Sequence, residues 1–177
     1  MKFTLIAAVS VLSTLVSGLA LPNLVPRSTV FQPNVAVVIK EDFPTTSFPT
    51  TTAEVGRSNG QHNMKTLLAF VIPPCSGTCT VSFDGASSAT GSQRMQFFTL
   101  GYPPSAGNTW NSKPYTDIHK GTFQTAGSST GTVVEDFGLT FNCPSVITNY
   151  GFEVQPVWDN DYVTWDTTTA GYIITCP

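Results

Sequence analysis

Four cysteines are the residues whose types and spacing point most directly to chemistry. Cys75 and Cys79 lie close together, whereas Cys143 and Cys176 follow much later in the chain. Four thiols can hold zinc, but such sites normally use two close pairs and this chain has one. We therefore expect two disulfides, with no metal or other cofactor. Of the three possible connectivities, we predict Cys75–Cys79, which closes one turn, and Cys143–Cys176, which joins the ends of two predicted strands.

Aromatic side chains in polar stretches are the second group with possible chemistry. Trp110, Trp165, Tyr102 and Tyr115 have polar neighbours in the sequence. Exposed aromatic rings in β-sandwich proteins can stack on sugar rings, so these four are the predicted ligand-binding residues. Packing in the core or against a loop is the alternative for each of them, because a buried aromatic ring contributes a large apolar area. Trp158 falls on the apolar side of its predicted strand, and we expect it to be buried.

An acid–base pair is the third possibility. Asp117 and His119 would share one face of an extended segment and could bind a metal or exchange protons. The chain has no Gly-x-Ser-x-Gly motif, and neither His119 nor His62 lies beside a recognisable nucleophile. We predict that these residues lie on the surface and that the protein has no catalytic site.

A calcium site is the remaining alternative. Asp159, Asn160 and Asp161, with Asp166 beyond them, offer oxygen ligands. The spacing lacks the glycine-centred loop of twelve residues found in calcium hands. We expect a solvated turn at this position and no metal.

The elements that must position these residues are strands. Residues 65–72 are apolar on both faces, which predicts a central strand, and Pro73 and Pro74 end it. Residues 133–143 and 150–158 alternate between apolar and polar, which predicts two antiparallel strands with one wet face each. Further strands are predicted at 35–40, 79–83, 95–100 and 172–176, with a loop at 84–93 and an ambiguous segment at 115–123. This pattern predicts an all-β fold, a single antiparallel β-sandwich of jelly-roll or Ig-like type closed by two disulfides.

The beginning of the chain predicts export. Residues 1–20 combine Lys2, an apolar segment and small residues before Leu21, which is the pattern of a secretory signal peptide. Residues 21–34 are expected to be an N-terminal tail or a short pro-segment cut after Arg27, and residues 35–177 one β-sandwich domain. Export places the cysteines in an oxidising compartment, which favours disulfides over zinc. We expect no transmembrane anchor, because the apolar segment is too short.

The charge composition limits the classes of molecule that we expect the protein to bind. The sequence carries 8 basic and 11 acidic residues and no basic cluster, so we expect no binding to the phosphate backbone of nucleic acid. The threonine-rich residues 45–52 are expected to form either an exposed edge or a site for O-linked sugars.

Four short motifs are similar to one known family. They are KTLLAFVIP before the close cysteine pair, CTVSF after it, FNCP in mid-chain and GYIITC at the end. Together they resemble the fungal "ubiquitin 3 binding protein But-two, C-terminal domain" family over residues 35–177. The resemblance implies a β-sandwich that is often exported or tethered at the cell surface, and it brings no catalytic motif. The family's name refers to an intracellular ubiquitin-like pathway, whereas this chain carries a predicted export signal.

Three functional classes follow from these observations. We expect a secreted, noncatalytic binding or structural module, associated with the cell wall, whose partner is a wall polysaccharide or an extracellular protein. A secreted interaction protein acting on a host or neighbouring cell is one alternative, and a secreted hydrolase is the other. His119 and a carboxylate converging in a deep pocket would favour the hydrolase.

Overall fold

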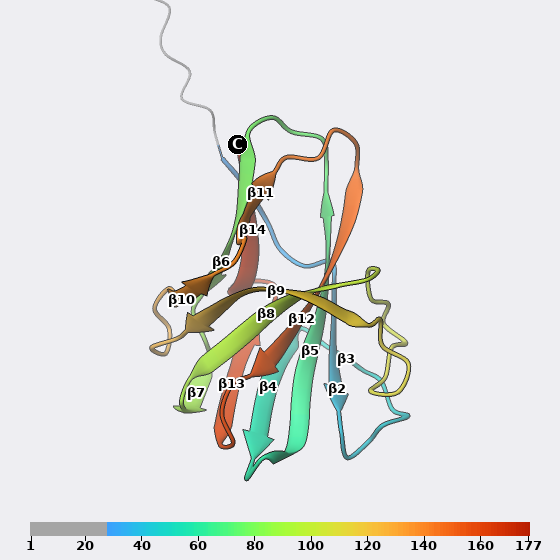
Figure 1. Cartoon of the computed structure of the whole chain (residues 1–177), viewed down its shortest axis with the longest axis vertical. Helices are drawn as coiled ribbons and strands as arrows, with labels where there is room; N and C mark the ends of the chain where they lie inside the picture. The colour runs from blue at the N-terminus through green and yellow to red at the C-terminus, as the bar shows by residue number, and fades with distance from the viewer. Residues whose placement is uncertain (1–27) are drawn as a thin grey trace, which may run out of the picture.

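A computed structural model describes residues 28–177 of the protein, and these residues form strands joined by turns and loops (Figure 1). The strands are β1 (Thr29–Phe31), β2 (Val35–Lys40), β3 (Phe48–Pro49), β4 (Thr52–Ser58), β5 (Gln61–Ile72), β6 (Thr78–Asp84), β7 (Ser88–Gly91), β8 (Arg94–Leu100), β9 (Thr116–Gln124), β10 (Thr132–Asp136), β11 (Thr140–Asn142), β12 (Thr148–Pro156), β13 (Asp161–Asp166) and β14 (Gly171–Cys176). The predicted signal peptide and the cleavage after Arg27 lie outside the described residues.

The strands form two antiparallel sheets. The small sheet has the order β1-β14-β6-β11, and the large sheet has the order β10-β9-β8-β12-β5-β4-β13-β7. In the large sheet β2 also pairs with β5, and β3 pairs with β2. One cluster of buried side chains contains residues from both sheets, so the sheets pack as a sandwich, which confirms the predicted fold class. Residues 28–177 contain no helix long and apolar enough to cross a membrane.

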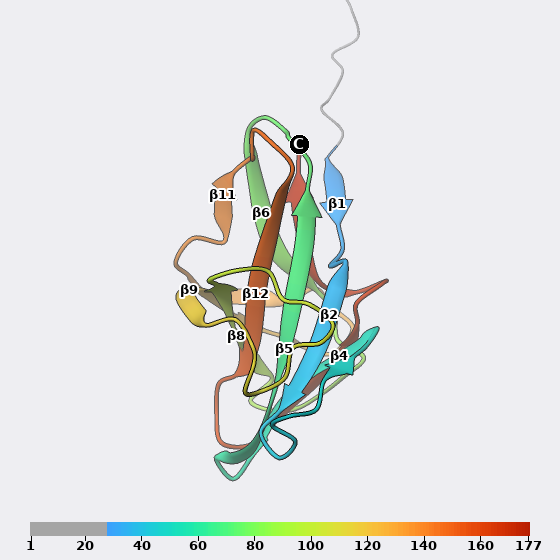
Figure 2. The same cartoon turned by 90° about the vertical axis from the view of Figure 1, so that its right-hand side faces the viewer.

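Strand β5 lies at the centre of the large sheet (Figure 2). Leu68 and Phe70 point to the inner face, which packs on the small sheet, and both are fully buried. Leu67 and Ala69 point to the opposite, outer face, and they are buried as well. The prediction of a central strand is therefore confirmed, with both faces covered at residues 66–70, whereas Val71 near the end of the strand is 41% exposed. Something other than the small sheet must cover the outer face.

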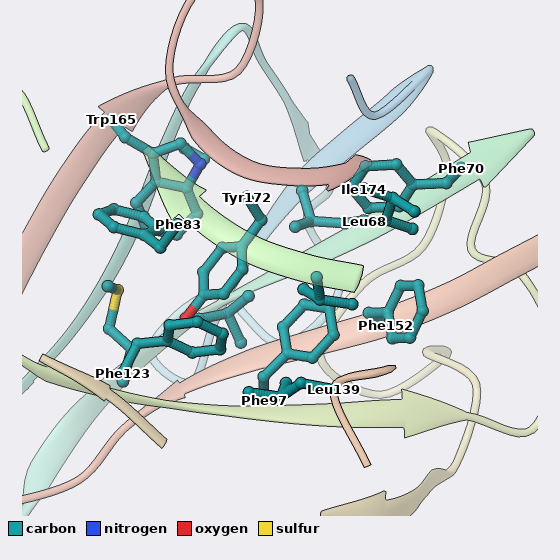
Figure 3. Packing of buried hydrophobic residues seen from close by; sticks show 14 of the residues in the cluster. Leu68, Phe70, Phe83, Phe97, Phe123, Leu139, Phe152, Trp165, Tyr172 and Ile174 are labelled. Carbon is teal, nitrogen blue, oxygen red and sulfur yellow. The ribbon is translucent and has the colours of Figure 1, made fainter. Parts of the chain in front are cut away.

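Aromatic rings fill the core between the sheets (Figure 3). The ring of Phe97 stacks between Phe152 and Tyr172, with centroid distances of 4.5 and 4.8 Å. Trp165 meets Phe83 edge to face at 5.6 Å and Tyr172 at 5.8 Å. These offset and edge contacts are the arrangements that aromatic rings prefer, and each ring brings a large apolar area out of water.

Residues 133–143 do not form the single strand predicted from their alternation. β10 pairs with β9 in the large sheet, whereas β11 pairs with β6 in the small sheet. A turn separates them, where Asp136 accepts backbone hydrogen bonds from Gly138 and Leu139. Gly138 has φ +125°, a conformation that side chains rarely tolerate. The chain therefore crosses from one sheet to the other, and Phe137, which the alternation of residues 133–143 places on the apolar face, is exposed.

Several segments outside the predicted strands also pair. β1 lies in the predicted N-terminal tail and pairs with β14, so the sandwich begins upstream of residue 35. β7 lies in the predicted loop 84–93 and pairs with β13. β4 and β13 pair with each other and bury alternate residues, namely Ala53, Val55, Val163 and Trp165. The ambiguous segment 115–123 is β9, which pairs with β8.

The two disulfides exist, but their predicted pairing is wrong. Cys75 bonds to Cys143, and Cys79 bonds to Cys176. The physical reason is strand order: β6 lies between β14 and β11, so Cys143, which follows β11, is not the cross-strand neighbour of Cys176 at the end of β14. Cys79 in β6 is instead the neighbour of Cys176, with Cα atoms 4.3 Å apart. The Cys143 amide donates to the Gly77 carbonyl at 3.0 Å, and this contact brings Cys143 beside Cys75.

Candidate functional site

The outer face of the large sheet is covered by the connection between β8 and β9. We call residues 101–115 the outer loop, and three of the four predicted ligand-binding residues lie in it. Figure 2 shows this loop running across β12 and β5 towards β2. Gly151 in β12 makes the close approach possible, because a Cβ at this position would lie 2.8 Å from the Cα of Pro103. The outer loop is therefore packed directly onto the sheet.

A buried carboxylate holds the C-terminal end of the outer loop. Glu153 in β12 points to the outer face and its side chain is 0% exposed. Its Oε1 lies 3.0 Å from Lys65 Nζ of β5, and its Oε2 lies 2.6 Å from Lys113 Nζ of the loop. Thr116 donates to Oε2 at 2.7 Å and Gln155 donates to Oε1 at 2.7 Å. Both carboxylate oxygens are thus fully engaged, which a buried charge requires.

The ionisation of Glu153 follows from these contacts. Burial disfavours the charged carboxylate and by itself raises its pKa. The charge of Lys65 and the hydrogen bonds from Lys113 and Thr116 act in the opposite direction and together outweigh burial. The pKa of Glu153 is therefore lowered from its ordinary value of 4.5, and the ion network is intact at neutral pH.

Trp110 anchors the middle of the outer loop. It packs against the outer-face cluster of Val37, Ile39, Leu67 and Leu100. Lys65 Nζ lies 5.1 Å from the centroid of its ring, at cation–π distance. The next residue, Asn111, donates its amide to the Pro44 carbonyl at 3.0 Å. Trp110 is thus half-buried, and its ring attaches the loop to the outer face of the sheet.

Tyr102 and Tyr115 are the exposed aromatic residues of the outer loop. Their exposed fractions are 54% and 65%. The two ends of the loop are joined where the Gly101 amide donates to the Tyr115 carbonyl at 3.0 Å. The Tyr115 ring lies over Gly101, since a Cβ there would fall 2.1 Å from ring atoms of Tyr115. Two tyrosine side chains therefore project from neighbouring points of a fixed loop.

Two tryptophans differ in burial from the prediction made for them. Trp165 is 0% exposed and belongs to the core, so its prediction as a ligand-stacking residue is wrong. Its neighbours in the sequence are polar because they point out of β13, whereas Val163 and Trp165 point inward. Trp158 was predicted to be buried and is 56% exposed, because it follows Pro156 and lies beyond the end of β12.

His119 and Asp117 do not form a pair. The His119 ring stacks on Phe98 at 4.7 Å and leans on Phe137 at 5.1 Å. Its Nε2 lies 3.0 Å from the Gly121 carbonyl, so this nitrogen donates a hydrogen bond to the backbone. Asp117 is exposed, as predicted, and within residues 28–177 no ion pair joins it to His119.

The acidic residues proposed as calcium ligands each serve a different turn. Asp161 accepts hydrogen bonds from Ser92 and from the Gln93 amide, and Asp166 accepts from Thr168. Asn160 accepts from the Asn59 amide at 3.0 Å. In the described part of the chain, the four cysteines are the one group of three or more metal-ligating residues that converge, with their Sγ atoms within 4.8 Å of one another. All four are bonded in disulfides, which leaves no thiolate for a metal.

The sequence pattern did not predict the buried ion network around Glu153. The alternation of β12 indicated a wet outer face, and Glu153 fitted that interpretation. The structure corrects it: Gly151 and Glu153 are both buried beneath the outer loop. One signal in the sequence could have revealed the cover, because Leu67 and Ala69 on β5 make the same face apolar.

Neither the scan against models of protein families nor the search of curated proteins gives a match. The resemblance to the But-two family therefore stays an expectation based on four short motifs.

Proposed function

We propose that this protein is a secreted, noncatalytic binding module that attaches to wall polysaccharide through Tyr102 and Tyr115. The observation that supports the proposal is the exposure of both rings on a loop fixed by the buried Glu153 network. A rigid tyrosine offers a large amphipathic surface and loses little conformational entropy on binding. Export rests on the predicted signal peptide at residues 1–20.

Polysaccharide is the partner that this surface suits best. A sugar ring presents C–H groups on one face that can lie on an aromatic ring, while its hydroxyl groups bond to polar neighbours. The outer loop that carries Tyr102 and Tyr115 also carries polar side chains, namely Ser105, Asn108, Thr109 and Ser112, which hydrogen-bond within the loop. Trp110 contributes by holding the loop in place.

The experiment that tests the proposal is a pull-down of the purified protein on insoluble chitin, β-glucan and mannan. The double variant Tyr102→Ala/Tyr115→Ala should lose most of its retention, and its melting temperature should change little because both rings are exposed. Trp158→Ala is the matched control, since Trp158 is similarly exposed but lies outside the outer loop. Absence of retention of the unaltered protein on all three polysaccharides would refute the proposal, as would equal loss in the control.

The noncatalytic part of the proposal needs its own test. The only imidazole of the predicted acid–base pair stacks on Phe98 and donates to the backbone, which suits a structural role. The purified protein should show no turnover of glycan, ester or peptide substrates. Turnover that disappears in His119→Ala would favour a hydrolase instead.

A further inference from the structure

A cavity opens between the two sheets, on the side opposite to the outer loop. It has a volume of about 270 Å³. It lies where the chain crosses from β10 to β11, beside the turn at Gly138, and β12 and β8 form its floor. This position is on the inner side of the large sheet, so the cavity is independent of the polysaccharide surface proposed above.

Aromatic rings form the walls of the cavity. The ring of Tyr150 lies 5.2 Å from Phe141 and 6.3 Å from Phe152, the latter at an angle of 14°. Val81 adds an aliphatic side chain from β6. Tyr150 and Phe141 are half-buried, so apolar area remains free to pack against a ligand.

One cation lies in the lining of this apolar cavity. Within residues 28–177, Lys120 is the one lysine or arginine whose side chain makes neither an ion pair nor a hydrogen bond. Its Nζ lies beside Gly138, where a Cβ would come within 3.2 Å of it. The absence of a side chain at Gly138 thus leaves the ammonium group free. Asn142 and Thr99 complete the polar part of the lining.

We propose that this cavity binds a small amphipathic monocarboxylate, with its apolar part between Phe141, Tyr150 and Phe152 and its carboxylate on Lys120. The negative charge of the proposed ligand is inferred from the unpaired ammonium group of Lys120, which an anion would complement. The size follows from the volume, which lies just below the range of about 300–1,000 Å³ for pockets that hold drug-sized ligands. The apolar part can be an aromatic ring or a short alkyl chain, and both fit these walls.

The test is an NMR titration of the purified, disulfide-bonded protein with phenylacetate and with octanoate. Saturable shifts of the backbone amides of Thr99, Lys120 and Asn142 are expected, with a dissociation constant of about 1 mM for a ligand of this size. The acid that binds more tightly identifies the apolar part. If neither acid produces a saturable shift at concentrations up to about ten times the expected dissociation constant, the proposal is overturned.

A charge variant and a neutral ligand separate the contribution of Lys120 from that of the walls. Lys120→Met should weaken binding of the better acid about threefold to fivefold, as expected for a partly exposed ion pair. Phenylacetamide, which has no charge, should bind Lys120→Met and the unaltered protein equally. Lys40→Met removes the same charge at a position outside the cavity, and the affinity of this variant for the better acid should equal that of the unaltered protein. Equal weakening in both lysine variants, or none in Lys120→Met, would contradict carboxylate recognition by Lys120.

Discussion

The two faces of the large sheet are covered by different means. The inner face packs on the small sheet through aromatic rings, and two disulfides close one end of this core. The outer face is covered by a loop without regular structure, which depends on a small apolar cluster and on one buried carboxylate with two lysines. Apolar packing needs only complementary shapes, whereas a buried charge needs every partner in place. Stability should therefore depend on apolar volume on the inner face and on charge pairing on the outer face.

The largest effect is expected from Trp165 on the inner face. Trp165→Ala removes a fully buried ring that contacts Phe83 and Tyr172. The free energy of unfolding should fall by about 5 kcal/mol, the upper end for such truncations. Urea denaturation followed by circular dichroism measures it, with exposed Trp158→Ala as the control. Comparable losses in the two variants would contradict the distinction between core and surface.

The disulfides should contribute almost equally to stability. Their sequence separations are 97 and 68 residues, for which loop entropy gives about 4–5 kcal/mol each as an upper estimate. We therefore expect Cys79→Ala/Cys176→Ala and Cys75→Ala/Cys143→Ala each to lower the free energy of unfolding by about 4 kcal/mol. The pairing predicted from the sequence would instead make one bridge much weaker than the other.

Peptide mapping without reduction tests the connectivity directly, and it should recover Cys75 joined to Cys143. Mild reductant should open this bridge first, because Cys79 and Cys176 are buried in the core whereas Cys75 and Cys143 are half-buried. Recovery of a peptide that joins Cys75 to Cys79 would refute the pairing.

On the outer face, Glu153→Gln tests the buried charge. The substitution keeps the shape but leaves Lys65 and Lys113 without their anion, so the free energy of unfolding should fall by about 3 kcal/mol at neutral pH. The pKa of Glu153 is lowered in the folded protein, so its stabilisation is complete above its ordinary value of 4.5 and is lost as the pH falls through the folded value.

The variant should therefore lose less stability than the unaltered protein between neutral and acidic pH. Urea denaturation at a series of pH values measures the difference between the two curves. Parallel curves over this range would show that Glu153 is not the titrating group.

The smallest effect is expected from a more exposed ion pair, which joins β2 to β4. Lys40 Nζ lies 2.6 Å from Glu54 Oε1, and both side chains retain contact with solvent. Lys40→Met should lower the free energy of unfolding by less than about 1 kcal/mol, and added salt should reduce the difference further. A loss as large as that caused by Glu153→Gln would contradict the expectation that the buried Glu153 ion pairs contribute more to the free energy of unfolding than the Lys40–Glu54 pair.

The sequence by itself determined the fold class and most of the strands. Alternation of apolar and polar residues identifies a strand because successive side chains point to opposite faces, and this local rule predicted β6, β12 and β14. A run of β-branched residues predicted β2, and segments that are apolar on both faces predicted β5 and β8. The pattern of β5 also indicated that both of its faces are covered. The number of cysteines and the pattern of residues 1–20 led to two disulfides, whose existence the structure confirms.

Tertiary structure alone decided which cysteines pair, which tryptophans are buried and what covers the outer face. The partner of Cys176 depends on β6 lying next to β14, and strand order arises from contacts between residues far apart in the chain. Trp165 is buried because β13 pairs with β4, which no local pattern specifies. Glu153 has the sequence context of a surface residue, and it becomes a buried anchor because the outer loop brings Lys113 across the sheet to meet it.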